Sequence, residues 1–508
     1  MTTAKITAIS ALKDLNGADA LVVGTARNAD GSLRLEAGAL TSILDAEGLL
    51  SALTDLGATG NADEVIKVPG TTTKVIVATG LGAAPARGSF DHEALRRAAG
   101  AAARTLAGTK HAVFALPART VALTAAVTEG ALFGAYVFDA FRGATLSSRK
   151  PALAKATIAS PIAAPEARKA LQRAQALARA VHFVRDMINT PPSHLNPETF
   201  VDESRALVKE MGGKAAGLTV RVLDEDQLRA GGYGGIVGVG QGSANPPRLI
   251  HISYTPTRVK ERIAFVGKGI TFDSGGLALK PAQGMEEMKS DMSGAAAVVG
   301  AVAAIAALKL PIAVDVWAAM AENMVSDTAQ RPSDILTTYG GRTVEVLNPD
   351  AEGRLVMADA LVRAQEVGKR AGGLAALIDV ATLTGAQMVA LGTRTSAIMG
   401  NEASLIDSLF AASKQAGEAF WPMPLPEELR ASLDSPVADI ANIGDRYGGM
   451  LVAGIFLKEF IEEGQAWAHL DIAGPAFNPK APHGYTPVGG TGVAVRTLVS
   501  FAETLTGR

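Results

Sequence analysis

Residues 263–276 of this chain read Ile263-Ala264-Phe265-Val266-Gly267-Lys268-Gly269-Ile270-Thr271-Phe272-Asp273-Ser274-Gly275-Gly276. The first four residues predict a short buried strand, and the glycines after them predict that the chain leaves a sheet through a loop. In open α/β sheets such loops line the crevice in which ligands bind. Lys268 and Asp273 lie in this stretch, and Lys280 and Asp291 follow it. The stretch therefore predicts an α/β sheet with charged side chains at one edge.

A second polar group lies at residues 348–355, which read Asn348-Pro349-Asp350-Ala351-Glu352-Gly353-Arg354-Leu355. Burying an ion without a partner costs several kcal/mol, so two acids two positions apart in an apolar context favour a cation between them. Taken alone, the same spacing also fits a solvated loop in which Arg354 is a surface partner. Together with Lys280 and Asp291, the two segments supply four carboxylates, two lysines and one arginine, enough for two metal ions.

The residue types narrow the metal chemistry. The chain has no cysteine, and its seven histidines form no H-E-x-x-H pair, so a histidine-rich zinc site is not predicted. Carboxylate oxygens suit Mg²⁺ and Mn²⁺, and Zn²⁺ also accepts them. Two such ions about 3.5–4 Å apart can activate water and stabilise the oxyanion formed at a carbonyl. The prediction is two-metal hydrolysis, and a two-metal phosphohydrolase is the alternative enzyme.

Both segments resemble the metal-binding blocks of the leucyl aminopeptidases, also called cytosol aminopeptidases. The resemblance runs from about Ala176 to the C-terminus and is loose over the first third of the chain. It departs at Pro349, where the family usually carries threonine, and proline removes an N–H and fixes φ. Further matching blocks occupy residues 189–192, 240–249, 379–386 and 489–493.

The resemblance implies two divalent ions per subunit, Mn²⁺ or Zn²⁺, as cofactors. Asp273 and Glu352 would bridge both ions, Asp350 would complete the more exchangeable site, and Lys268 with Asp291 would complete the tighter one. A lysine ligand must be a neutral amine, and an adjacent divalent cation disfavours the ammonium form. Without metal, Lys268 is expected to be charged and paired with Asp273 or Asp291.

Lys280 and Arg354 are the catalytic residues that the resemblance implies. Lys280 would direct positive charge toward the developing oxyanion. Arg354 would hold a bicarbonate ion that acts as general base, because a guanidinium binds such an anion through two parallel hydrogen bonds. The simpler interpretations are a solvated lysine before Pro281 and an ion pair between Arg354 and Glu352.

The same resemblance implies peptide substrates with a free N-terminus, since a neutral α-amine can ligate one metal. Methionine and leucine in the side-chain pocket favour leucine-like first residues. It also implies a homo-hexamer. The implied pocket residues are Met288, Asn348, Thr382, Leu383, Gly385 and Ala473.

The length of the chain and the alternation of expected strands and helices predict two α/β domains. The chain has 508 residues and is 48% hydrophobic, enough for two cores. We expect an N-terminal α/β domain over residues 1–160, a linker helix over 161–187, and a catalytic domain over 188–508 whose mostly parallel sheet is flanked by helices. Residues 148–165 lack periodicity and read as a linker. Expected strands are 21–23, 75–77, 112–116, 263–266, 313–317, 375–380 and 467–471, and expected helices are 92–106, 122–142, 166–187, 295–308, 354–367 and 451–463.

Net charge and the search for targeting signals limit the partners and the cellular location that the sequence predicts. The net charge of −2 shows no basic excess, so nucleic-acid binding has no support from composition. No targeting segment is visible, and the longest apolar run, 295–308, is too short to span a bilayer and predicts a buried helix. With the absence of cysteine, this favours the cytoplasm. A non-catalytic scaffold or DNA-binding protein that keeps the fold is the third alternative.

Overall fold

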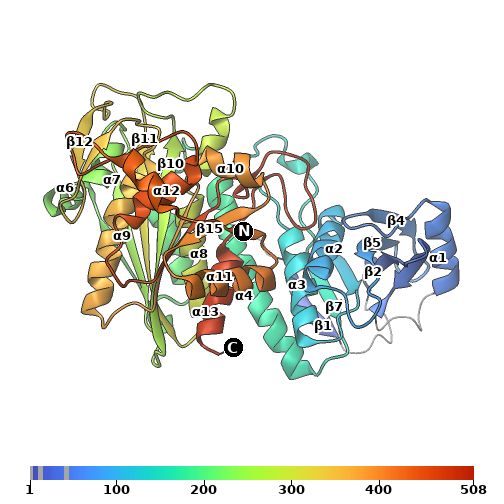
Figure 1. Cartoon of the computed structure of the whole chain (residues 1–508). Helices are drawn as coiled ribbons and strands as arrows, with labels where there is room; N and C mark the ends of the chain where they lie inside the picture. The colour runs from blue at the N-terminus through green and yellow to red at the C-terminus, as the bar shows by residue number, and fades with distance from the viewer. Residues whose placement is uncertain (1–3, 10–14, 16, 39–44, 508) are drawn as a thin grey trace. The chain divides into compact units, whose positions relative to one another are not determined.

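The computed structural model describes residues 4–9, 15, 17–38 and 45–507 (Figure 1). The chain forms two compact units, and each is described by itself. The first comprises Met1–His182 together with Pro479–Val488, and the second comprises Phe183–Asn478 together with Gly489–Arg508. Helix α4, Ala164–Asn189, runs through the boundary between them in the sequence.

The first unit is built on a seven-stranded sheet in the order β1-β7-β6-β2-β5-β4, with β3 paired to β2. The central strand β2 is buried over seven of its eight residues and pairs in parallel with β5 and β6. Its elements are β1 Lys5–Ile9, β2 Ala20–Arg27, β3 Leu33–Glu36, α1 Ala46–Asp55, β4 Val65–Pro69, β5 Val75–Ala83, α2 His92–Thr105, β6 His111–Ala115, α3 Val121–Gly134, η2 Leu146–Ser148 and β7 Lys155–Ala159.

Helices α2 and α3 pack closely because glycines face the contact. A Cβ on Gly130 would overlap the carbonyl oxygen of Arg96, so only glycine permits this approach. The same contact buries an ion pair in which Arg96 Nε lies 2.8 Å from a carboxylate oxygen of Glu129. Both side chains are almost fully buried, so each charge depends on its partner.

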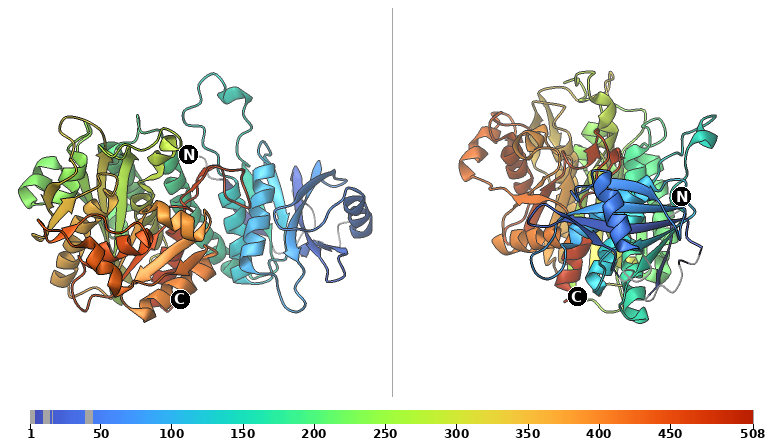
Figure 2. Two further views of the ribbon diagram at one scale, coloured as in Figure 1. Left: turned by 45° about the horizontal axis from the view of Figure 1, so that its top comes forward. Right: turned by 90° about the vertical axis from the view of Figure 1, so that its right-hand side faces the viewer.

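The segment Pro479–Val488 joins the first unit although it lies late in the sequence (Figure 2). Tyr485 contacts Phe133 of α3 edge to face at 5.5 Å between ring centroids. Arg104 of α2 donates through Nε to the carbonyl of Gly484 at 2.8 Å. The sequence carries no local signal for this excursion, because contacts of such long range leave no periodicity.

The predicted strands and helices of the first unit are confirmed, with one exception. Helix α3 ends at Gly134, eight residues before the expected end at Arg142. The linker expected over residues 148–165 is wrong at its centre, because Lys155–Ala159 forms strand β7 between β1 and β6. Two of its five residues are alanine, which has low strand propensity, so the strand depends on its two neighbours.

The second unit contains an eight-stranded sheet in the order β16-β15-β18-β14-β10-β11-β9-β8. The central pairs β18-β14, β14-β10 and β10-β11 are parallel, as predicted. The pairs β11-β9, β9-β8 and β15-β18 are antiparallel. Its strands are β8 Leu218–Leu223, β9 Arg248–Tyr254, β10 Glu261–Asp273, β11 Ile312–Asn323, β14 Ala376–Ala381, β15 Ser396–Gly400, β16 Phe420–Pro422 and β18 Trp467–Asp471.

Two small sheets and the helices complete this unit. Strand β13 pairs with β12 and β17 in one small sheet, and β19 pairs with β20 in the other. The remaining elements are α5 Pro197–Glu210, η3 Gly213–Ala216, α6 Glu225–Gly231, α7 Gly234–Gly240, η4 Met285–Ser290, α8 Ser293–Ala307, β12 Asp334–Thr337, β13 Thr343–Val346, α9 Gly353–Arg370, α10 Gly385–Leu391, α11 Ala403–Ala416, η5 Glu427–Leu433, β17 Ile440–Ala441, α12 Gly449–Lys458, β19 Phe477–Asn478, β20 Gly489–Gly490 and α13 Val495–Leu505.

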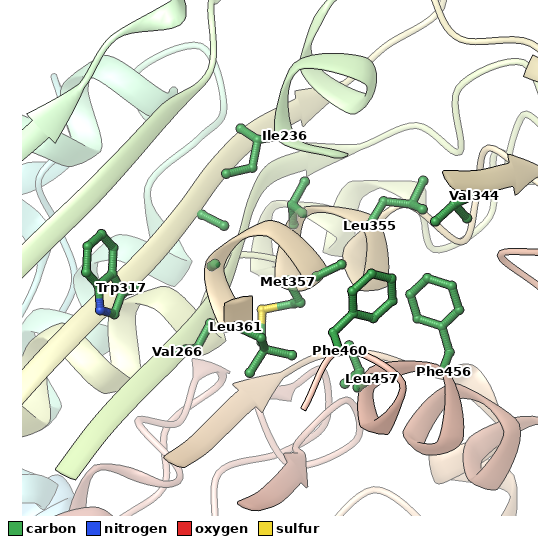
Figure 3. Packing of buried hydrophobic residues seen from close by; sticks show 14 of the residues in the cluster. Ile236, Val266, Trp317, Val344, Leu355, Met357, Leu361, Phe456, Leu457 and Phe460 are labelled. Atoms are coloured by element: carbon green, nitrogen blue, oxygen red, sulfur yellow. The ribbon is translucent and has the colours of Figure 1, made fainter. Parts of the chain in front are cut away.

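One face of the large sheet is covered by α9, α7 and α12, which share a hydrophobic core with the central strands. Leu355 and Met357 of α9 lie beside Phe456 and Phe460 in this core (Figure 3). Burying a side chain of this size contributes about 1.5–3 kcal/mol. The apolar stripe of α9 therefore fixes the helix whose first turn carries Arg354.

Helix α8 is buried along nearly its whole length. Among the described residues, the stretch Met285–Ala307 is the one helical segment with the length and apolar composition of a membrane span, and 94% of its most apolar window is buried inside the protein. The prediction of a buried helix over 295–308 is thus confirmed. Small residues let α8 approach β10 and β14 closely.

Gly294 is the tightest of these approaches, and its replacement tests the packing. In Gly294→Ala the new Cβ would overlap the carbonyl oxygen of Val380 and lie 3.0 Å from the amide nitrogen of Lys268. Since both are backbone atoms, we expect a loss of about 1–3 kcal/mol or more in unfolding free energy, measured by urea denaturation. The control is Gly449→Ala, whose Cβ would meet only Ala386 Cβ at 3.6 Å. Equal stability of the two variants would contradict the packing described here.

Candidate metal centre and active site

Three carboxylates meet at the end of strand β10. Asp273 is the last residue of β10, while Asp350 and Glu352 lie between β13 and α9. Each offers one oxygen atom, and these three atoms lie within 4.8 Å of one another. Asp273 and Glu352 are 2% and 1% exposed, so their charges are removed from bulk water. Asp291, which follows η4, is also buried.

Two lysines lie between the carboxylates. Lys268 Nζ is 2.8 Å from Asp291 Oδ2 and 2.8 Å from Glu352 Oε1. Lys280 Nζ is 2.8 Å from Asp273 Oδ2 and 2.5 Å from Asp350 Oδ1. Each lysine thus joins acids that are distant in the sequence. The structure pairs Lys268 with Asp291, one of the two acids expected from the sequence, and adds Glu352.

Burial and the neighbouring charges raise the pKa values of three of the acids and of both lysines. Burial raises the pKa of Asp273, Asp291 and Asp350 above the ordinary range of aspartate. Burial alone would lower the pKa of Lys268, but the charges of Asp291 and Glu352 raise it above its ordinary value. The same competition, with Asp273 as the first partner, raises the pKa of Lys280. The acids are therefore short of positive charge, and the lysines are held as ammonium ions.

This donor set fits divalent cations. Glu352 Oε2 is buried and has no hydrogen-bond partner among the residues that the structure describes. Three buried acids and the partly exposed Asp350 share two direct ion-pairing partners, so added positive charge would stabilise the cluster. Oxygen ligands of this kind are those that Mn²⁺, Mg²⁺ and Zn²⁺ accept. The arrangement can hold metal at the ends of parallel strands, where α/β sheets bind ligands.

Pro349 is accommodated by a tight turn. Ala351 N donates to Asn348 O at 3.0 Å, which closes a four-residue turn, and Asp350 N donates to Asn348 Oδ1 at 2.9 Å. Proline is favoured at the second position of such turns, and that position has no role as donor in the closing hydrogen bond. Proline at this position therefore removes no donor from the hydrogen bond that closes the turn.

Arg354 lies in the first turn of α9 and is buried. Its Nη1 donates to the carbonyl of Asn442 at 2.8 Å, and its guanidinium carbon lies 5.8 Å from the ring centre of Phe456. Its Nε has no hydrogen-bond partner among the described residues. Burial lowers the pKa of Arg354 to about 10, against the opposing charges of Glu352 and Asp471. A bound anion would restore the ordinary preference for the charged form.

Most pocket residues implied by the resemblance lie near this cluster. Thr382 Oγ1 is 2.8 Å from Asp291 Oδ1, and the Thr382 carbonyl accepts from Lys268. The amides of Leu383 and Ala473 both donate to Asp471 Oδ1, at 3.1 and 3.2 Å.

Three further implied residues complete that set. Asn348 forms the turn described above. Gly385 begins α10, and an added Cβ there would meet no atom within 4 Å. Met288 lies on η4 and is placed by its carbonyl, which accepts from the amide of Asp291.

Two asparagines at the site were not predicted from the sequence. Asn323 Nδ2 donates to Asp273 Oδ1 at 2.8 Å and to Pro349 O at 3.1 Å. Asn442 contacts the same turn from a different strand. Asn323 ends strand β11 and Asn442 follows strand β17, and an asparagine at a strand end is ordinary. Only the three-dimensional contacts distinguish them.

Comparison with known proteins places the chain in a family. Residues 182–499 match the model of the cytosol aminopeptidase family, catalytic domain, and residues 21–145 match that of the family's N-terminal domain. The chain belongs to the cytosol aminopeptidase family. It is 53% identical over 500 residues to a probable cytosol aminopeptidase of Streptomyces avermitilis, covering 96% of each chain. A probable cytosol aminopeptidase of Micrococcus luteus is 50% identical over 512 residues, covering 97% of each chain.

Solved structures of similar proteins share the fold. The bottromycin maturation enzyme BotP, solved in complex with Mn, is 36% identical with a TM-score of 0.84, and the match covers 96% of this chain and all of that one. A mutant of tomato leucine aminopeptidase is 30% identical with a TM-score of 0.84, over 98% of this chain and 96% of that one. As a member of this family, the chain is a metal-dependent leucyl aminopeptidase that acts on peptides.

Gly353 allows Lys268 to reach the carboxylates, which yields a test of the site. In Gly353→Ala the new Cβ would lie 2.5 Å from Lys268 Cε and 2.6 Å from its Nζ. We expect displacement of the lysine and at least a tenfold loss in Mn²⁺ affinity, roughly the size seen when groups around a metal are disturbed. Titration of the metal-free protein measures it. Gly385→Ala, also at the first residue of a helix but facing open space, should bind Mn²⁺ normally.

Proposed function

We propose that this cytosol aminopeptidase releases N-terminal residues, preferring leucine and similar apolar ones, with two divalent ions, Mn²⁺ or Zn²⁺, at the buried cluster. The observation that carries the proposal is the convergence of three carboxylate oxygens within 4.8 Å, flanked by two lysines. The proposed ligands are Lys268, Asp273, Asp291, Asp350 and Glu352.

The contacts of these residues support the roles that we propose within this set. Glu352 is paired with Lys268 and also lies within the cluster of three acids, which supports a bridging role for it and for Asp273. Asp291 is reached only through Lys268 among the ion pairs of the described residues, which supports a separate, tighter site built on these two. When bound, the two ions supply Lewis-acid activation of water and of the scissile carbonyl.

Lys280 is proposed to stabilise the oxyanion. Its side chain is about one-fifth exposed, unlike that of Lys268, so one side of the ammonium can face a substrate. The charges of Asp273 and Asp350 hold it in the cationic form. A fixed cation aimed at developing negative charge lowers the barrier by a few kcal/mol in comparable sites.

Arg354 is proposed to hold bicarbonate, which would supply a proton acceptor. The guanidinium is buried, its Nε has no hydrogen-bond partner among the described residues, and one Nη is already fixed by Asn442. A cation with free donors in a dry site favours a small anion that can accept two hydrogen bonds.

Substrate selection is proposed to depend on Met288, Asn348, Thr382, Leu383, Gly385 and Ala473. The open space at Gly385 leaves room for a side chain, and Asp471 fixes the loops that carry Leu383 and Ala473. A free α-amine would face the carboxylates and ions, so an acylated amine should bind poorly.

Assembly, location and domain division complete the proposal. We propose a homo-hexamer in the cytoplasm, on the strength of the family resemblance. We also keep the division into an N-terminal domain, residues 1–160, a linker helix, 161–187, and a catalytic domain, 188–508. All the proposed site residues lie in the third of these parts.

Hydrolysis of leucine p-nitroanilide tests the activity. The purified protein should lose activity when chelated and regain it with Mn²⁺ or Zn²⁺, because the acids need cations to act on a carbonyl. The N-acetylated substrate serves as the control and should not be cleaved. Cleavage of a phosphoester with none of the anilide would instead favour a two-metal phosphohydrolase.

Glu352→Gln tests the bridging role. The change keeps the shape but removes one charge from the cluster, so we expect turnover to fall about 100–1,000-fold, the range that one catalytic electrostatic group supplies. Metal affinity, measured by titration, should also fall. The matched control is Glu418→Gln, a buried glutamate that accepts from Thr497 and lies beside Arg496. A near-normal rate in Glu352→Gln would contradict the assignment.

A further inference from the structure

Asn442 is a fully buried asparagine whose backbone is fixed by a small sheet. It follows β17, and β17 pairs in parallel with β13 through Val344 and Ile440. Its amide nitrogen donates to the carbonyl of Glu345 at 2.9 Å. The residue therefore has little freedom to move relative to β13, the strand that leads into the turn carrying Asp350.

The side-chain amide of Asn442 forms hydrogen bonds at both ends of that turn. Its Oδ1 accepts from the amides of Leu347, at 2.8 Å, and Asn348, at 3.2 Å. Its Nδ2 donates to the carbonyls of Asn348, at 2.7 Å, and Ala351, at 3.4 Å. An amide side chain has two acceptor sites and two N–H donors, so all four are used. Such complete use in a buried place fits a structural clamp.

The main-chain carbonyl of Asn442 makes a separate contact, with Arg354. It accepts from Arg354 Nη1 at 2.8 Å. One residue thus contacts both the turn that carries Asp350 and the arginine proposed to hold the anion. These two groups lie on opposite sides of Glu352 in the sequence, and a shared anchor sets the distance between them.

Asn323 holds the other side of the turn in a different way. It donates directly to the carboxylate of Asp273 as well as to Pro349 O. Replacing Asn323 would therefore disturb a proposed ligand and the turn at once. Asn442 contacts no carboxylate of the cluster through the hydrogen bonds of the described residues, so its effect can be measured separately.

We propose that Asn442 is a positioning residue that holds the turn bearing Asp350 in register with Arg354. The inference rests on the proposed function, because it assigns Asn442 an influence on the proposed metal and anion sites. Asn442 acts through these groups and needs no contact with the substrate. Its side-chain amide supplies hydrogen bonds to four backbone groups around this turn.

Asn442→Asp tests the clamp with almost no change of volume. A carboxylate can still accept from the amides of Leu347 and Asn348, but it would place an acceptor against the carbonyls of Asn348 and Ala351. We expect Mn²⁺ affinity at the weaker site of the metal-free protein to fall about 10–100-fold, as happens when outer contacts of a metal ligand are lost. In steady-state kinetics, kcat should fall more than KM rises.

Asn401→Asp is the matched control. Asn401 also accepts from a backbone amide, that of Trp467, and donates to a backbone carbonyl, that of Gln465, both at 2.8 Å. It should lower thermal stability while leaving Mn²⁺ affinity and kcat unchanged. Equal effects of the two variants on Mn²⁺ affinity would overturn the positioning role, as would normal Mn²⁺ affinity in a folded Asn442→Asp protein.

A second variant covers failure of Asn442→Asp to fold. Asn442→Ser removes the hydrogen bonds of the side-chain amide but keeps the main-chain carbonyl that accepts from Arg354. It should weaken the same Mn²⁺ site. Normal Mn²⁺ affinity in this variant would also overturn the proposal. Mn²⁺ titration of the metal-free protein does not depend on hydrolysis. A wild-type protein that binds Mn²⁺ but cleaves no peptide would contradict the proposed function while leaving the test of Asn442 readable.

Discussion

The structure of the second unit depends on a concentration of buried negative charge that the chain balances only in part. Asp273, Asp291, Asp350 and Glu352 have two direct ion-pairing partners, Lys268 and Lys280. Removing such ions from water costs several kcal/mol each, and pairing recovers this only when the geometry is good. The surrounding elements must therefore hold the loops firmly, since any relaxation would separate the charges from their partners.

Close packing of backbones supplies that firmness. Glycines at 294 and 353 let α8 and α9 approach the chain around Lys268 to distances that a Cβ would forbid. Leu355 and Met357 anchor the start of α9 in the hydrophobic core. The four proposed carboxylate ligands thus lie close to the start of a helix or the end of a strand, while Lys268 lies inside strand β10. Their backbones are held by elements that are buried for independent reasons. A site built in this way loses little entropy when metal binds.

The residues that bear charge in apolar surroundings could be found from sequence, because such residues are costly without a function. Lys268, Asp273 and Glu352 belong to that class, and the structure brings them together. The asparagines at 323 and 442 could not be found, since an uncharged polar residue near a strand end is common. Strand β7 escaped prediction because its pairing with β1 and β6 outweighs its alanine content. The local sequence likewise gives no indication that Pro479–Val488 belongs to the first unit.

Pro349 shows how one local departure can be absorbed by a site. The closing hydrogen bond of its turn runs from Ala351 to Asn348, so the position tolerates a residue without N–H. Proline there also reduces the freedom of the unfolded chain, an effect of about 0.4–1 kcal/mol where the native φ is compatible. The carbonyl of Pro349 remains in use, because Asn323 donates to it. The turn is therefore rigid for two separate reasons. The proline ring restricts its backbone, and the side-chain amides of Asn323 and Asn442 hydrogen-bond to it. Both constraints fix the position of Asp350.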